Sequence, residues 1–162
     1  MAIETLIEDP RWDDLGLETL VSKAAHALGA RLGLDVEACE GSVLACDDAR
    51  IAVLNAEFRD KDSATNVLSW PAEERGTPDA RPDLPAPDFD GTIELGDIAI
   101  SYDTCAREAA EADKSLADHA THLIVHGLLH LLGYDHISDT DAAIMEGTET
   151  EILATLGVPD PY

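Results

Sequence analysis

Histidine is concentrated in one short segment of the chain. Five of the six histidines fall within eighteen consecutive residues: His119, His122, His126, His130 and His136. On a helix, positions 126 and 130 share one face and are separated by a rise of ~6 Å, so two imidazoles can converge on one ion. Gly133 has no Cβ and suits a left-handed turn that returns His136 to the same point.

Three imidazoles with an open fourth position are typical of a catalytic zinc site, because structural sites usually close all four positions with protein ligands. We therefore predict one zinc ion on His126, His130 and His136, with water as the fourth ligand. A histidine pair alone is commonly a packing accident, and it is the full HxxxHxxGxxH spacing that favours a metal. His122 lies one turn earlier on this face, where a substitute ligand, an outer hydrogen-bond partner and a proton carrier are all open roles.

Two neighbours of the predicted ligands have other expected roles. His119 is expected to face solvent or to pack at the start of the helix. Asp135 is expected either to orient a ligand imidazole or to shape the turn before His136.

The spacing also matches the zinc motif of metzincin proteases, HExxHxxGxxH, except that Gly127 replaces the glutamate. That glutamate is the general base of the protease. A peptidase would need a substitute such as Glu146, Glu149 or Glu151, and these carboxylates are expected to form a solvated helix face. The pattern therefore argues against peptide hydrolysis.

Residues 126–136, HGLLHLLGYDH, resemble the HGxLHLxGYDH signature of the YbeY family, bacterial zinc-dependent endoribonucleases of ribosomal RNA maturation. The resemblance extends to residues 54–62 (LNAEFRDKD), 65–71 (TNVLSWP) and 95–101 (LGDIAIS). It implies that the three histidines are zinc ligands and that Arg59 is functionally important. Phe58 stands where the family often has tyrosine, Trp70 stands where it has phenylalanine, and residues 71–91 look longer than the usual connection.

Arg59 carries a planar, permanently charged fork that suits phosphate oxygens. Spacing alone favours an ordinary salt bridge with Asp60 or Asp62, whereas the family resemblance favours the functional role. The resulting hypothesis is a zinc-dependent endoribonuclease in ribosomal RNA processing, maturation and ribosome quality control, with a zinc-bound water and Arg59 acting on an RNA phosphodiester. The alternatives are a zinc peptidase-like hydrolase and a non-catalytic zinc-containing ribosome-assembly factor.

Composition limits the partners. Ten Lys and Arg stand against thirty-four Asp and Glu, a formal charge of -24 that repels nucleic acids at long range. We therefore expect ribosomal RNA precursor to be engaged with help from ribosomal proteins or other assembly factors, and expect no DNA. No aromatic run identifies a base-reading surface. No membrane span or targeting segment is visible, so a cytoplasmic protein without membrane contact is expected.

Hydrophobic periodicity predicts the elements that position these residues. Strands are expected at 2–8, 36–46, 66–70 and 92–101, and helices at 17–32, from 47 or 48 to about 58, at 102–113, 115–132 and 139–156. Residues 71–91 contain five prolines and predict an exposed loop. The expected fold is α+β: a single domain over 1–162, with a small mixed β-sheet packed with about five helices and the zinc site at the end of a central helix.

Overall fold

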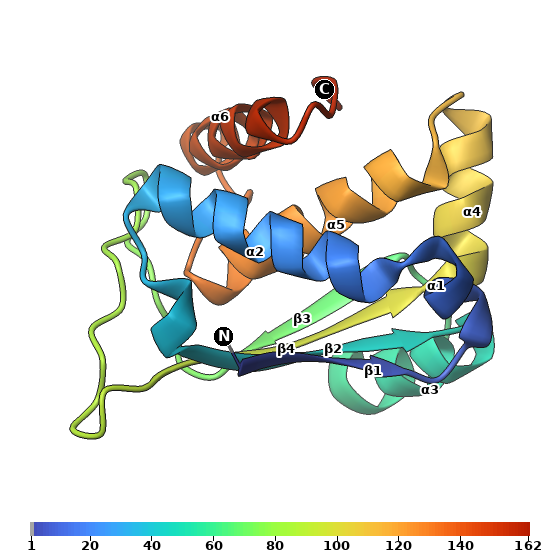
Figure 1. The fold of residues 1–162 in the computed structure, drawn as a ribbon, viewed down its shortest axis with the longest axis horizontal. Coiled ribbons are helices and arrows are strands. Elements are labelled where there is room, and N and C mark those ends of the chain that lie inside the picture. Colours follow the sequence, from blue (N-terminus) through green and yellow to red (C-terminus); the bar gives the residue numbers. More distant parts are fainter. Residues whose placement is uncertain (1) are drawn as a thin grey trace.

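A four-stranded mixed sheet forms the base of the molecule in the computed structural model, which describes residues 2–162 (Figure 1). The strand order is β1-β2-β4-β3, with β1, β2 and β4 parallel to one another and β3 antiparallel to β4. The strands are β1 (Ala2–Ile7), β2 (Cys39–Cys46), β3 (Val67–Pro71) and β4 (Ile93–Ser101). The helices are α1 (Pro10–Leu15), α2 (Leu17–Leu32), α3 (Asp48–Arg59), α4 (Tyr102–Glu111), α5 (Leu116–Leu131) and α6 (Asp139–Thr155).

Helices cover both faces of the sheet, as the alternation of side chains along the strands requires. In β2, Val43 and Ala45 enter the main core beneath α2 and α5, whereas Cys46 packs on the opposite face with Ile51 of α3. Helix α6 forms an outer layer over α2 and α5 (Figure 1). The predicted α+β fold with a small mixed sheet is confirmed.

Helix α5 is the central helix because its apolar residues extend most of the way around it. Buried residues of this helix include Leu123, Ile124, Val125, Leu128 and Leu129. The Ser115 hydroxyl accepts a hydrogen bond from the backbone N–H of Asp118 at 3.1 Å and caps the helix start. The two histidines at 126 and 130 therefore sit on a helix fixed from several sides.

Two expected boundaries were wrong at the N-terminal side. No helix was expected between the strand at 2–8 and the helix at 17–32, but Pro10 is the first residue of α1, where its missing N–H costs nothing, and Asp9 caps that helix. The strand predicted from residue 36 begins at Cys39, because Asp35 caps a short 3₁₀ turn over Val36–Ala38. With α1, residues 2–162 hold six α-helices against the five expected.

Helices α3 and α4 cap each other at their N-termini. The Asp48 Oδ1 atom accepts hydrogen bonds from the hydroxyls of Ser101 and Thr104, both at 2.6 Å. In return, Asp103 Oδ2 accepts the backbone N–H of Asp48 at 3.0 Å. This exchange fixes the start of α3, whose last residue is Arg59.

The connection between β3 and β4 is largely exposed, as predicted, and is fixed at two points. The Arg75 guanidinium donates to the carbonyl oxygens of Leu131 at 2.8 Å and Glu94 at 2.6 Å. Further along, Asp79 accepts a hydrogen bond from the Ser138 hydroxyl at 2.7 Å. The loop therefore joins the end of α5 to the start of α6. In residues 2–162, no helix has the length and apolarity needed to cross a membrane.

Candidate metal centre

The three predicted ligands come together at the C-terminal end of α5. The Nε2 atoms of His126 and His130 are 3.0 Å apart, and the ring of His136 lies 5.6 Å from the first ring and 5.1 Å from the second, centroid to centroid. One nitrogen of each ring lies within 4.8 Å of the others. The three histidines form a group able to hold a metal ion.

Gly133 makes this convergence possible, as the sequence predicted. Its φ of 103° lies in the region that favours glycine, and a Cβ there would stand 2.7 Å from the backbone of Arg75 and Gly76. Asp135 Oδ1 then accepts the backbone N–H of His136 at 2.8 Å. Of its two expected roles, shaping the turn is the one supported by this contact.

The proton positions on the two helical rings favour a bound cation. The Nδ1 of His126 lies 2.6 Å from Glu149 Oε1, and the Nδ1 of His130 lies 2.9 Å from the carbonyl oxygen of Tyr134. A carboxylate and a carbonyl oxygen only accept hydrogen bonds, so both Nδ1 atoms carry protons, and in the neutral rings both Nε2 atoms present lone pairs. Two lone pairs facing each other at 3.0 Å repel unless a cation lies between them.

The separation also suits a metal of zinc's size. Zn–N bonds of ~2.0–2.1 Å in a tetrahedral site place two ligand nitrogens ~3.3 Å apart. Burial, and then the neighbouring His126 imidazole, lower the pKa of His130 to about 4. That ring is therefore neutral at pH 7, which is the form that ligates metals.

Glu149, from α6, supports the site from behind. The side chain is fully buried, and its second oxygen, Oε2, lies 2.9 Å from His122 Nε2 and 2.5 Å from the Tyr162 hydroxyl. Burial raises the pKa of Glu149, but hydrogen bonds from His122, His126 and Tyr162 outweigh it and bring the pKa to about 2. An ionised carboxylate therefore fixes the orientation and tautomer of the His126 ring.

The expectation that Glu149 belongs to a solvated helix face was wrong. The sequence did contain a signal: Met145, Glu149, Ile152 and Leu153 are spaced to lie on one helical face, and all four are buried. A carboxylate in such a stripe requires polar partners. Tyr162 had no local signal, because only the tertiary structure brings the chain's last residue to this position.

The other histidines of the segment do not join the group of three. His122 bonds Glu149, which matches the expected outer hydrogen-bond partner. His119 packs against α4, where its Nε2 lies 2.9 Å from Glu108 Oε1, so the packing alternative holds rather than the exposed one.

Arg59 and the histidines face one cleft of about 720 Å³. Arg59 Nη2 donates to the carbonyl oxygen of Ser69 at 3.0 Å, which holds the guanidinium over β3. Within residues 2–162, no carboxylate oxygen lies within 4.0 Å of the Arg59 guanidinium, so the salt bridge to Asp60 or Asp62 favoured by spacing is wrong. The chain turns away at Asp60, whose φ is 56°. The fork keeps most of its donors for a ligand.

Gly127, which stands in place of the protease glutamate, packs closely against the sheet. A Cβ at this position would lie 2.9 Å from Ile98 Cδ1 of β4. The carboxylates suggested as substitutes, Glu146, Glu149 and Glu151, do not line the cleft. The site therefore lacks the base arrangement of a metzincin protease.

Comparison with known proteins places this architecture in a family. A family model described as "Endoribonuclease YbeY" matches residues 3–157. A protein of that name from Ruegeria pomeroyi is 60% identical over 100% of this chain and 98% of its own length, and another from Dinoroseobacter shibae is 58% identical over 99% and 90%.

A solved protein from Thermotoga maritima shares the fold with a TM-score of 0.58 at 22% identity, covering 96% of this chain and 92% of its own. The matches at the sequence level extend over the histidine segment, the Arg59 segment and the strands between them. The chain belongs to the YbeY family of endoribonucleases.

Proposed function

We propose that this chain is a zinc-dependent endoribonuclease of ribosomal RNA processing and ribosome quality control, and that residues 1–162 work as one hydrolase domain. His126, His130 and His136 hold the ion, and Arg59 binds the phosphate of the scissile bond. Endonucleolytic RNA cleavage is the activity of the family to which the chain belongs. The observation that carries the proposal is the pair of facing Nε2 lone pairs in the same cleft as Arg59.

Zinc in a three-histidine site acts as a Lewis acid and makes water a nucleophile near neutral pH. The chain's own residues supply the geometry. Glu149 and the Tyr134 carbonyl select the neutral tautomer with its lone pair on Nε2 and direct both Nε2 atoms at one point. Arg59, held by Ser69, orients the phosphate and stabilises the charge that develops on its oxygens.

The cleft contains limited positive charge to attract RNA. Arg59 and Arg75 line it together with Glu74 and Asp135. Residues 115–162 contain neither Lys nor Arg, and the formal net charge is -24. We therefore propose that ribosomal RNA precursor reaches the cleft with ribosomal proteins or other assembly factors that supply the missing electrostatic attraction.

The activity is tested with purified protein of measured metal content on ribosomal RNA precursors and on peptides, beside His130→Ala and Arg59→Ala. We expect RNA cleavage that both substitutions reduce at least ~100-fold, as for loss of a transition-state contact. Equal cleavage by all three proteins indicates contaminating nuclease and refutes the assignment. Cleavage of peptides alone favours the peptidase-like alternative, and a zinc-bound protein that cuts neither substrate favours the assembly factor.

The identity of the ion requires its own measurement, because imidazole also suits copper, nickel and iron. We expect the chelator-stripped protein to regain activity with one equivalent of zinc. Metal analysis of the untreated protein provides the control. Restoration by another ion at equal occupancy, with none by zinc, refutes the zinc assignment.

A further inference from the structure

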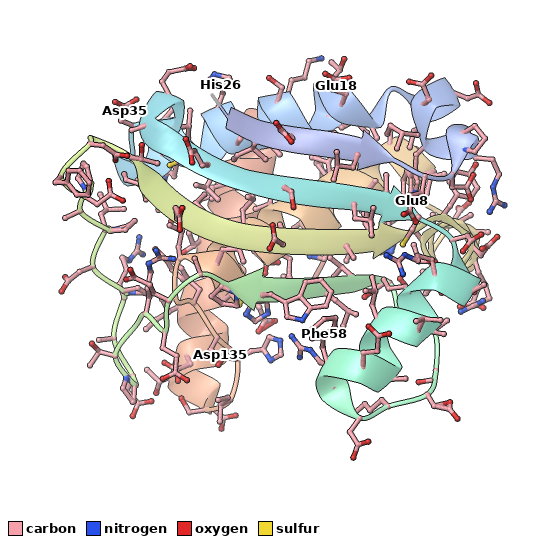
Figure 2. The ribbon with its side chains drawn as sticks, turned by 90° about the horizontal axis from the view of Figure 1, so that it is seen from below. Glu8, Glu18, His26, Asp35, Phe58 and Asp135 are labelled. Atoms are coloured by element: carbon pink, nitrogen blue, oxygen red, sulfur yellow. The ribbon has the colours of Figure 1, made fainter. Side chains whose placement is uncertain are left out.

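An exposed aromatic pair lies beside the metal cleft. Phe58, one residue before Arg59, is 62% exposed. Its ring meets the half-buried ring of Trp70 on β3 edge to face, with centroids 5.5 Å apart. Figure 2 shows Phe58 beyond the edge of the sheet formed by β3, the same edge beyond which Asp135 lies.

This pair belongs to a second hollow that continues from the metal cleft. A depression of about 700 Å³ is lined by Phe58, Trp70 and Lys61, and it shares Arg59, Ser69, Pro71 and Glu74 with the metal cleft. The two spaces therefore meet at the guanidinium proposed to hold the scissile phosphate. The shared lining places Phe58 and Trp70 beside residues that border the metal cleft.

The charges around the pair suit a nucleotide. In residues 2–162, neither Arg59 nor Lys61 has a carboxylate oxygen within 4.0 Å of its charged nitrogens. Arg59 and Lys61 line the depression together with one carboxylate, Glu74. Aromatic faces flanked by such cations are how proteins bind single-stranded nucleic acid, with the base on the ring and the phosphate on the cation.

We propose that Phe58 and Trp70 form a stacking site for one base of a single-stranded RNA, next to the phosphate held by Arg59, with Lys61 contacting a neighbouring phosphate. The proposal rests on the endoribonuclease function and adds the two residues that bind a base beside the scissile phosphate. The sequence contains no aromatic run that identifies such a site, because positions 58 and 70 meet only in the folded chain.

The test uses the zinc-loaded protein and single-stranded RNAs of roughly ten nucleotides, a length that such grooves commonly cover. Each RNA in a set carries one abasic ribose at a different position. The chain has two tryptophans, and Trp12 is fully buried, so quenching of fluorescence on binding reports Trp70. Binding is read immediately after mixing, before cleavage accumulates, and cleavage of the same RNA is followed in parallel.

We expect Phe58→Ala to weaken RNA binding about 5- to 150-fold, the loss of one stacked base. Phe58→Trp is expected to retain binding, and Phe89→Ala, which removes a fully exposed aromatic ring elsewhere, to leave it unchanged. In one RNA of the set, the abasic ribose is expected to lie at the stacking site. That RNA should bind wild type more weakly by the same factor, and its missing base should have little further effect on binding by Phe58→Ala.

Equal RNA binding by Phe58→Ala and Phe89→Ala, with wild type cutting the RNA, overturns the stacking site and leaves the nuclease function intact. This is also the result expected if the pair docks a protein instead. Wild type that neither binds nor cuts RNA overturns the nuclease function and the stacking site together. Since Phe58 is exposed, thermal unfolding of Phe58→Ala should match wild type, so a loss of binding reports the site itself.

Discussion

Replacement of Glu149 tests the support of the metal site without touching a proposed ligand. The carboxylate accepts three hydrogen bonds, from His126 Nδ1 at 2.6 Å, His122 Nε2 at 2.9 Å and the Tyr162 hydroxyl at 2.5 Å. Glu149→Ala leaves the buried Nδ1–H of His126 without an acceptor. Glu149→Gln keeps one oxygen for His126 but removes the charge and turns an N–H₂ group toward the other partners.

The expected magnitudes follow from these contacts. Outer-shell partners of a metal-bound histidine contribute 10- to 100-fold in metal affinity, or about 1.4–2.8 kcal/mol. We expect Glu149→Gln near the lower limit and Glu149→Ala near the upper one. Glu149→Ala should also lower the free energy of unfolding of the metal-free protein by about 1–3 kcal/mol, because it leaves buried donors unpaired.

Zinc affinity is measured by competition with a chromogenic chelator at pH 7.5, and the folded fraction by circular dichroism. Glu151→Gln is the control, since it neutralises a half-exposed carboxylate of the same helix that pairs with Arg31 at the surface. Wild-type zinc affinity in Glu149→Ala, with reduced affinity in His130→Ala, would refute the supporting role of Glu149.

Three further substitutions test the remaining structure. Arg59→Lys keeps the charge but loses the bidentate fork, so kcat on RNA should fall about 10-fold or more with zinc content unchanged; unchanged kcat contradicts the phosphate contact. Asp48→Ala should lower the free energy of unfolding in urea by about 2–3 kcal/mol at pH 7. Burial raises the pKa of Asp48, but hydrogen bonds from Ser101 and Thr104 outweigh it and lower the pKa in the folded protein. The stabilisation by Asp48 is therefore fully present above the unfolded pKa of ~3.9 and is lost as the pH falls through the lower folded pKa. A difference in unfolding free energy between wild type and Asp48→Ala that stays constant down to pH 3 excludes this account. Gly133→Ala should lower the free energy of unfolding by more than ~1 kcal/mol and weaken zinc binding, because the φ of Gly133 is 103°. Gly147→Ala should stabilise the protein slightly, because Gly147 is a helical position with open space around it. Equal shifts in melting temperature for the two variants count against the role of the turn at Gly133.

The local sequence was enough to predict the helices and strands and to predict that three histidines come together. Spacing of four residues places His126 and His130 on one helical face whatever surrounds the helix, and Gly133 permits the turn that the structure shows. Apolar periodicity located the four strands and the main helices. The failures lay where capping decides the outcome, at Pro10 and at Asp35, because a single side-chain hydrogen bond there shifts the boundary.

Only the tertiary structure decided what surrounds the histidines. Glu149 and Tyr162 reach His126 through the packing of α6 and the chain end against α5, and Phe58 meets Trp70 because α3 ends beside β3. Such contacts depend on how elements dock, which local periodicity does not specify. The sequence by itself therefore determined which histidines come together. Packing between distant segments decided how those residues are oriented and what lies next to them.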